Sequence, residues 1–421
     1  MASSPSLTLI PPRRPLTGAV DVPGSKSLTN RALLVAALAQ GACVLSGFLA
    51  SDDTRYMAEA LRRMGVSVTP GDTPHTVRVE SSGTLHPPGE TLFLGNAGTA
   101  TRFLTAAAAL VLGPVTLDGD AHMQKRPLRP LLDALRLLGV ESDSPTGCPP
   151  VTVHGTGGTF PTPRITVDAR LSSQYVSALL MMAGASRTGL DIALEGGAAI
   201  GGRGYIDLTL AVMRHFGAEV TESESGAWRV APRGYTARDY AVEPDASSCT
   251  YVWGLEALTE STLPVPLDPL ASLQPDARSR ALFRLFPHMP AIVDGAQMQD
   301  SVPALAVVAA FNANPVRFVG IANLRVKECD RIRALAEGLN QIKPGLATEE
   351  GDDLVVRGDP TLTKAAPGAV IDTHDDHRIA MSFALAGLRA EGVTIQNPAC
   401  VAKTFPTFWD ELTKLGVILK A

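Results

Sequence analysis

Residues 27–40 read SLTNRALLVAALAQ, and their pattern is that of a helix buried on every side. A small polar residue at the start can cap the helix, and the apolar residues that follow cover nearly its whole circumference. Such a helix must be surrounded by other parts of the protein, so we expect it in the interior of a domain. Five further segments follow the same plan: residues 99–112, 172–185, 246–259, 300–313 and 376–389.

A second, amphipathic kind of helix alternates with the first, often with proline near its first turn and glycine after its end. These helices are expected at residues 52–66, 126–140, 205–220, 275–286, 328–341 and 405–417. The buried kind recurs every roughly 72 to 76 residues, except for one interval of roughly 54 residues. That short interval, between Ala246 and Asp300, predicts that the fourth unit has lost a piece.

Short β-rich runs between the helices complete a unit of strands plus two helices that is repeated six times. The chain is therefore predicted to be of the α/β (α+β) class, with three units in each of two lobes. We expect an N-terminal lobe at residues 22–241, and a C-terminal lobe that joins residues 1–21 to residues 242–421 and begins with the shortened unit. If the six buried helices run parallel, their positive dipole ends would face one cleft and attract anions.

The composition narrows the function classes. A net charge of -5 argues against a general nucleic-acid-binding protein, which needs an excess of Lys and Arg. Five scattered cysteines without a CxxC pair suit reduced thiols in the cytoplasm better than disulfides or a zinc site. The longest apolar stretch, residues 103–112, is far shorter than the roughly 20 residues of a membrane span. We therefore expect a cytoplasmic protein that binds neither membranes nor nucleic acids and uses no metal.

The unusual polar residues gather at the starts of the predicted helices. Lysine and arginine there lie where the helix dipole disfavours cations, and a bound anion would offset that cost. Each cation alone could be a solvated surface charge, and Asp300, Asp376 or His377 could serve the fold only. The candidate residues are Lys26, Ser27, Arg31, Asn96, Gly98, Arg126, Ser172, Ser173, Gln174, Asp300, Asn323, Lys327, Glu328, Arg331, His377, Arg378 and Lys403.

Several long motifs now point to one family. They include PGSKSLTNRALLVAAL at residues 23–38, LGNAGTATRFLTA at 94–106, SSQYVSALLM at 172–181, RVKECDRI at 325–332 and DDHRIAMSF at 375–383. In these motifs and their order, over nearly the whole chain, the sequence resembles the 5-enolpyruvylshikimate-3-phosphate synthase family. The resemblance implies the enolpyruvyl transferase fold, a two-lobed inverted α/β barrel of six βαβαββ repeats, three per lobe.

The resemblance also implies an activity: transfer of the enolpyruvyl group of phosphoenolpyruvate to the 5-hydroxyl of shikimate 3-phosphate, with release of phosphate. No cofactor is implied, glyphosate is an expected inhibitor, and we expect a monomer. The implied shikimate 3-phosphate ligands are Lys26, Ser27, Arg31, Ser172, Ser173, Gln174, Tyr205, Asp300, Asn323 and Lys327. The implied phosphoenolpyruvate ligands are Lys26, Asn96, Gly98, Arg126, Gln174, Arg331, Arg378 and Lys403.

The chemistry assigns three catalytic roles. The hydroxyl that attacks C2 must lose a proton, and C3 must gain a proton and later release it. Asp300 is expected to accept the hydroxyl proton, while Glu328, or Lys26 as an alternative, handles the proton at C3. Because a carboxylate beside Lys327 and Arg331 tends to stay ionised, Glu328 needs burial or substrate charge to act as an acid.

Three departures from the family pattern affect this interpretation. Gly202 stands where the family usually has serine, so one hydroxyl contact to shikimate 3-phosphate is absent or replaced by Arg203. Phe103 stands where proline is common, and the shortened fourth unit lies just before Asp300. Two alternatives remain open here: a UDP-N-acetylglucosamine enolpyruvyl transferase, and a non-catalytic phosphate-binding module built from the same repeat.

Overall fold

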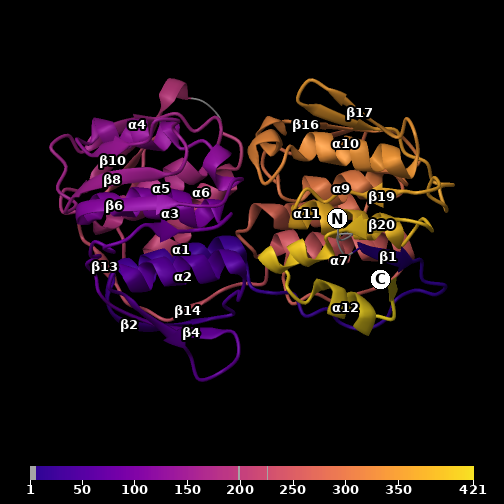
Figure 1. Cartoon of the computed structure of the whole chain (residues 1–421), viewed down its shortest axis with the longest axis horizontal. Coiled ribbons are helices and arrows are strands. Elements are labelled where there is room, and N and C mark those ends of the chain that lie inside the picture. The colour runs from indigo at the N-terminus through magenta and orange to yellow at the C-terminus, as the bar shows by residue number, and fades with distance from the viewer. Residues whose placement is uncertain (1–5, 198–199, 225) are drawn as a thin grey trace. The chain divides into compact units, whose positions relative to one another are not determined.

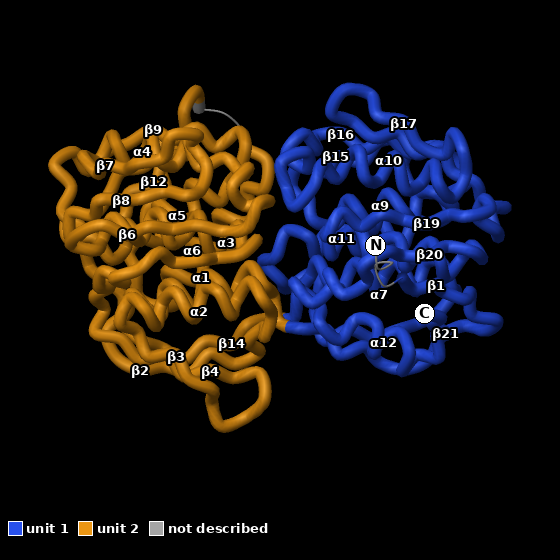
Figure 2. The backbone as a smooth tube through the Cα atoms, viewed as in Figure 1, with its two compact units in different colours: residues 1–23, 244–421 blue, residues 24–243 orange. Residues whose placement is uncertain are grey.

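The computed structural model describes residues 6–197, 200–224 and 226–421. The chain divides into two compact units, and it passes from one to the other twice. Unit 1 consists of residues 1–23 and 244–421, and unit 2 of residues 24–243 (Figure 2). Of the N-terminal segment that the sequence assigns to the C-terminal lobe, residues 1–5 lie outside the described residues.

The interior of unit 2 is built from three helices whose residues are almost all buried: α1 (Lys26–Leu38), α3 (Gly98–Ala107) and α5 (Gln174–Ala185) (Figure 1). They fall in three of the segments predicted to be buried helices, and α3 continues into the 3-10 turn η1 (Ala108–Leu110). The amphipathic helices of this unit are α2 (Asp52–Arg63), α4 (Arg129–Leu137) and α6 (Arg203–His215).

The described part of unit 2 also forms three mixed sheets. Their strand orders are β13-β2-β4-β3 with β14 also on β2, β5-β6-β8-β7 and β11-β12-β10-β9. The first sheet joins the two ends of the unit, because Tyr235 and Tyr240 near its end pair in parallel with Ala39 and Leu45 near its start. The strands are β2 (Ala39–Ser46), β3 (Ser67–Pro70), β4 (Thr76–Ser82), β5 (Leu92–Phe93), β6 (Leu112–Asp118), β7 (Glu141–Asp143), β8 (Val151–Thr156), β9 (Arg164–Val167), β10 (Leu190–Leu194), β11 (Val220–Glu222), β12 (Trp228–Val230), β13 (Tyr235–Thr236) and β14 (Tyr240–Ala241).

Unit 1 repeats the plan with α7 (Ala246–Thr259), α9 (Val302–Ala309) and α11 (His377–Gly387) as its buried helices. Asp245 and Asp376 cap α7 and α11, because their carboxylates accept hydrogen bonds from the backbone N–H groups of Ser248 and Arg378. The other helices are α8 (Arg280–Phe283), α10 (Arg331–Ile342) and α12 (Phe408–Lys414), with the 3-10 segments η4 (Pro275–Ser279), η5 (Ala322–Val326) and η6 (Pro398–Lys403).

Two sheets of unit 1 are described, in the orders β19-β20-β1-β21 and β15-β16-β18-β17. The N-terminal strand lies inside the first, where Leu7 is opposite Ile395 and Leu9 is opposite Leu419. The strands are β1 (Ser6–Ile10), β15 (Ile292–Asp294), β16 (Val316–Val319), β17 (Ala347–Glu350), β18 (Asp353–Val356), β19 (Val370–Ile371), β20 (Thr394–Gln396) and β21 (Ile418–Lys420).

The fourth of the six sequence repeats, which begins with α7 in unit 1, has lost its sheet. Within the described residues no strand lies between the end of α7 at Thr259 and the start of β15 at Ile292, so the sheet is the piece that the shortened fourth repeat lacks. The connecting segment contains Pro264, Pro266 and Pro269. Proline has no N–H to donate to a strand ladder, which explains why helical turns rather than strands pack against α7 here.

Each unit has its own apolar core, formed by its buried helices and the inward faces of its strands. Over the described residues, no helix is long and apolar enough to cross a membrane. In the same residues, no group of three or more His, Cys, Asp or Glu side chains is arranged to hold a metal ion.

Candidate active site

Lys26 is the first residue of α1, following the helix cap Ser25. Its Nζ lies 3.6 Å from Oδ2 of Asp53 in α2, and both side chains are largely buried. The carbonyl of the next residue, Ser27, accepts a hydrogen bond from Arg31 one turn further on. The start of α1 therefore presents one paired cation and holds a second cation, Arg31, through its backbone.

Arg31 is buried among neutral groups. Its Nε donates to Thr209 Oγ1 at 2.7 Å, and its Nη atoms donate to the Ser27 carbonyl at 2.9 Å, the Tyr205 carbonyl at 3.1 Å and Ser177 Oγ at 3.4 Å. Burial lowers the pKa of Arg31 to about 10, against smaller opposing effects of two tyrosines. Within the described residues no carboxylate pairs with this cation, although its side chain is only 1% exposed.

Two arginines flank the first residue of α3, Gly98. A Cβ atom added at Gly98 would lie 2.2 Å from Arg126 Nη1 and 2.9 Å from Arg102 Nη1, so only glycine fits between these guanidinium groups as they stand. The Gly98 N–H is turned back to the Asn96 carbonyl at 3.0 Å. Arg126 is thereby brought to the neighbouring residues Asn96 and Gly98 from a later segment of the chain.

Gln174, the first residue of α5, joins this group. Its Oε1 accepts from Arg102 Nη1 at 3.0 Å, and its Nε2 donates to Thr99 Oγ1 at 3.2 Å. Arg102 Nη1 also donates to the Gly98 carbonyl at 3.2 Å. Before α5, Ser172 Oγ accepts the Gln174 N–H at 3.2 Å, and Ser173 occupies the cap position without capping through its side chain.

Sequence reasoning missed Arg102. The signal was present, because Arg102 lies four residues after Gly98 in a helix and so on the same face. Arg203, the suggested replacement for the missing serine, is engaged elsewhere: its guanidinium pairs with Glu222 and Asp207 and lies over the Trp228 ring.

Arg331 is the centre of the corresponding group in unit 1. Its Nε lies 2.8 Å from Asp376 Oδ2, and its Nη atoms lie 2.7 Å from Glu328 Oε2 and 3.3 Å from Asp300 Oδ1. Three carboxylates from separate segments thus meet one buried guanidinium. Burial alone would lower the pKa of Arg331, but these three carboxylates together raise it above its ordinary value.

Arg378 and Lys403 complete this group. Arg378 Nη2 lies 2.8 Å from Asp300 Oδ2, and Lys403 Nζ lies 2.8 Å from Glu328 Oε1. Burial acts to lower the pKa of Arg378, and the surrounding negative groups, Asp300 first, raise it well above its ordinary value. We call Arg331, Arg378, Lys403, Asp300, Glu328 and Asp376 the charge cluster of unit 1.

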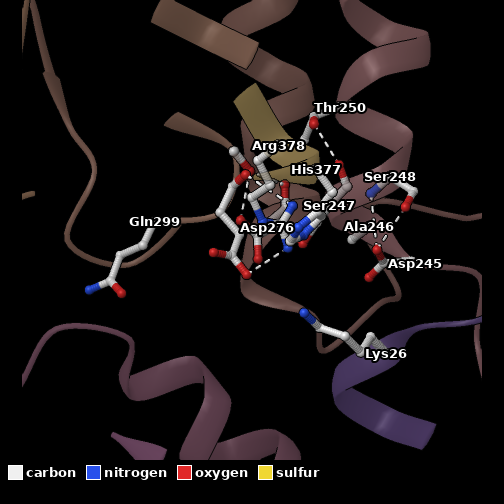
Figure 3. A network of polar contacts seen from close by, with 12 residues as sticks. Lys26, Asp245, Ala246, Ser247, Ser248, Thr250, Asp276, Gln299, His377 and Arg378 are labelled. Atoms are coloured by element: carbon white, nitrogen blue, oxygen red, sulfur yellow. Dashed lines mark hydrogen bonds and ion pairs between the residues drawn. The ribbon is translucent and has the colours of Figure 1, made fainter. Parts of the chain in front are cut away.

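Buried hydrogen bonds of Asp276 and Asp245 lie next to the charge cluster of unit 1. Asp276, in the shortened fourth unit, accepts a hydrogen bond from Ser301 Oγ at 2.8 Å, directly after Asp300 in sequence. Figure 3 shows Asp276 beside His377 and Arg378, with Asp245 bonded to Ser248 nearby. The fourth unit therefore keeps the residues that face the cluster although it has lost its sheet.

Three further residues named in the sequence analysis, Asn323, Lys327 and Asp376, also lie in unit 1. Asn323, in η5, donates from Nδ2 to Oε1 of Gln299, the residue before Asp300. Lys327 follows η5 at a partly exposed position. Asp376 was anticipated only as a possible helix cap, and the structure shows that it caps α11 and also pairs with Arg331.

Comparison with known proteins identifies the family of the chain. Residues 10–412 match the family model described as EPSP synthase (3-phosphoshikimate 1-carboxyvinyltransferase). The chain is 60% identical over 418 residues, 99% of each chain, to a 3-phosphoshikimate 1-carboxyvinyltransferase of Rhizobium leguminosarum bv. trifolii. It is 57% identical over 417 residues, again 99% of each, to one of Pseudomonas syringae pv. tomato.

Solved structures are similar as well. An EPSP synthase from Acinetobacter baumannii superposes with a TM-score of 0.77 at 26% identity, covering 99% of this chain and 100% of the other. The enolpyruvyl transferase NikO from Streptomyces tendae is similar in fold, with a TM-score of 0.74 at 18% identity over 99% of both chains.

Proposed function

This chain belongs to the EPSP synthase family, the 3-phosphoshikimate 1-carboxyvinyltransferases. We propose that the residues described above in its two units bind the substrates of this family's reaction and transfer its protons. Its activity is that of the family, in the shikimate pathway. The substrates are shikimate 3-phosphate and phosphoenolpyruvate. The assignment of individual residues is our proposal.

For shikimate 3-phosphate, the proposed ligands are Lys26, Ser27, Arg31, Ser172, Ser173, Gln174, Tyr205, Asp300, Asn323 and Lys327. The surroundings of Arg31 support its place among them. A guanidinium has five N–H donors, and the described residues accept four hydrogen bonds from this one. A buried cation without a carboxylate partner is stabilised when an anionic ligand approaches it.

For phosphoenolpyruvate, the proposed ligands are Lys26, Asn96, Gly98, Arg126, Gln174, Arg331, Arg378 and Lys403. Phosphoenolpyruvate carries a carboxylate and a phosphate, and arginine side chains bind both groups with two parallel hydrogen bonds. Gly98 supports the assignment because its lack of Cβ lets Arg126 lie against the start of α3.

The charge cluster of unit 1 is the observation that carries the proposed chemistry. Asp300 is held by Arg331 and Arg378, and Glu328 by Arg331 and Lys403. An anionic substrate competes with these carboxylates for the same cations. A carboxylate that loses its cationic neighbours binds a proton more readily, so substrate binding would turn Asp300 and Glu328 into effective proton carriers.

The proposed reaction then runs in two steps. In the addition, the 5-hydroxyl oxygen bonds to C2 while Asp300 accepts its proton and Glu328, or Lys26 in its place, gives a proton to C3. In the elimination, the group that protonated C3 takes a proton back, the C2–C3 double bond re-forms, and the bond from C2 to the phosphate oxygen breaks. Phosphate leaves and the enolpyruvyl ether remains.

Release of phosphate from shikimate 3-phosphate plus phosphoenolpyruvate tests the role of Asp300. The Asp300→Asn variant should be slower by about 10²- to 10⁴-fold at saturating substrates, the usual contribution of a general base. The matched control is Asp352→Asn, an exposed partner of Arg325 in the same unit, which should keep the full rate. A near-normal rate for Asp300→Asn would reject Asp300 as the base.

The same assay separates the acceptors. Phosphate should appear with shikimate 3-phosphate and not with UDP-N-acetylglucosamine in its place. We further propose that the chain acts as a monomer, that glyphosate inhibits it, and that it works in the cytoplasm, where its five free thiols stay reduced. Sedimentation velocity with and without substrates tests the oligomeric state.

We also propose that units 2 and 1 are the N-terminal and C-terminal lobes of an inverted α/β barrel. In the described residues, five of the six repeats each have a sheet and two helical segments. The fourth repeat has its helical segments alone. The boundaries after Pro23 and Glu243 lie two residues beyond those expected from the sequence.

A further inference from the structure

Phe103 departs from the family pattern, and in the structure it is fully buried in the middle of α3. The guanidinium carbon Cζ of Arg31 lies over the face of the Phe103 ring, 5.2 Å from its centre. The Tyr205 ring is the second aromatic neighbour, with its centre 6.0 Å from the same carbon. Two aromatic rings thus lie close to the guanidinium, while its N–H groups are hydrogen-bonded.

This division of contacts follows from the chemistry of the group. A guanidinium donates hydrogen bonds only in its plane, so Thr209, Ser27 and Tyr205 can hold its edges but not its faces. An aromatic ring attracts a cation to its face through its quadrupole, and this attraction is larger at desolvated sites. The ring therefore compensates part of the cost of burying the Arg31 charge.

We propose that Phe103 is a positioning residue for shikimate 3-phosphate binding: its ring forms the wall that keeps the Arg31 guanidinium charged and oriented toward the ligand. This inference rests on the proposed role of Arg31 as a ligand residue. It also gives α3 a second role, because Gly98 of the same helix is one of the proposed phosphoenolpyruvate ligands.

The simpler possibility is that Phe103 only fills the core of unit 2. The two roles differ in one respect: a core residue affects binding whether or not Arg31 is present, but a wall for Arg31 acts only through Arg31. A double-mutant cycle on shikimate 3-phosphate affinity measures this dependence.

The experiment determines the Kd of shikimate 3-phosphate by calorimetry for the full chain and for Phe103→Leu, Arg31→Met and the double variant. We expect Phe103→Leu to weaken binding about tenfold in the natural background, as loss of a cation–π contact at a desolvated site does. In the Arg31→Met background the same change should have less than about a twofold effect. The KM of phosphoenolpyruvate should stay within about twofold throughout.

Two controls keep the test decisive. Phe103→Met nearly conserves the volume without a ring and should match Phe103→Leu, which also covers the case in which the leucine variant folds poorly. Phe160→Leu changes another buried phenylalanine of the same core and should leave the Kd unchanged.

The outcomes are distinguishable. Equal weakening in both backgrounds, or no weakening at all, would overturn the role of Phe103 and leave that of Arg31 intact. If Arg31→Met itself leaves the Kd unchanged, the proposed ligand role of Arg31 fails, and the inference fails with it.

Discussion

Arg31 in unit 2 and Arg331 in unit 1 are equally buried, with 1% of each residue exposed, but their surroundings are opposite. Hydroxyls, carbonyls and aromatic rings surround Arg31, whereas three carboxylates surround Arg331. Burial therefore lowers the pKa of Arg31, while the carboxylates raise that of Arg331 in spite of burial. Two equally buried cations can therefore differ in charge compensation: one is held by neutral groups and the other by internal carboxylates.

The comparison predicts its largest effect at Arg331. Arg331→Met removes the guanidinium that pairs with the fully buried Asp376 and leaves the partly buried Asp300 and Glu328 only Arg378 and Lys403, so we expect the free energy of unfolding to fall by about 3–5 kcal/mol. Urea unfolding measures this loss. Arg333→Met, on the same helix but exposed, should change it by less than about 0.5 kcal/mol, and similar values for the two variants would contradict the comparison.

Arg31→Met should behave differently. The partners of Arg31 remain partly satisfied without it, because Thr209 Oγ1 lies within hydrogen-bond distance of both Ser177 Oγ, at 2.9 Å, and the Tyr205 carbonyl, at 2.8 Å. We expect a change of less than about 2 kcal/mol in unfolding, but a loss of about 1.5–3 kcal/mol in shikimate 3-phosphate binding, the value of hydrogen bonds to a charged group. The exposed Arg55→Met serves as control. A stability loss as large as that of Arg331→Met would remove the distinction.

Gly98→Ala tests whether the residues around Gly98 and those around Arg31, both in unit 2, act independently. The new Cβ would press on Arg126 and Arg102 but not on Arg31, at a cost of about 1–3 kcal/mol for crowding a packed site. Glyphosate inhibition should weaken more than the rate falls, and the KM of shikimate 3-phosphate should stay nearly constant. Steady-state inhibition measurements decide this, and equal loss of inhibition and activity would refute the steric argument.

The smallest expected effect is a change in folding stability at alkaline pH. Burial lowers the pKa of Arg31 to about 10 in the folded state, below its ordinary value in the unfolded chain, so the unfolded chain holds more protons above pH 10. The cost of burying the charge is complete below pH 10 and shrinks as the pH rises through that value. The stability of the natural chain relative to Arg31→Met should therefore rise by about 0.5–1 kcal/mol from pH 9 to pH 10.5. A fall over the same interval would show that Arg31 has a carboxylate partner in solution.

Much of the fold could be predicted because it depends on local pattern. Residues 246–259 were predicted as a buried helix, and α7 has those bounds. The predicted helix at 328–341 begins only at Arg331, because Asp330 caps it through a hydrogen bond from the Arg333 N–H. The missing sheet of the fourth unit was anticipated as a lost piece, but which piece was lost depended on what packs against α7.

The sequence by itself determined the helix periodicity and the family, and it identified most of the charged candidate residues near the helix starts, because each of these is encoded in short motifs. Only the tertiary structure decided what each buried cation meets. Thr209 reaches Arg31 from 178 residues away and Asp376 reaches Arg331 from 45 residues away, and no local pattern records such pairings. Their electrostatic consequence, a lowered pKa in one case and a raised pKa in the other, follows from those neighbours because buried charges respond to what surrounds them.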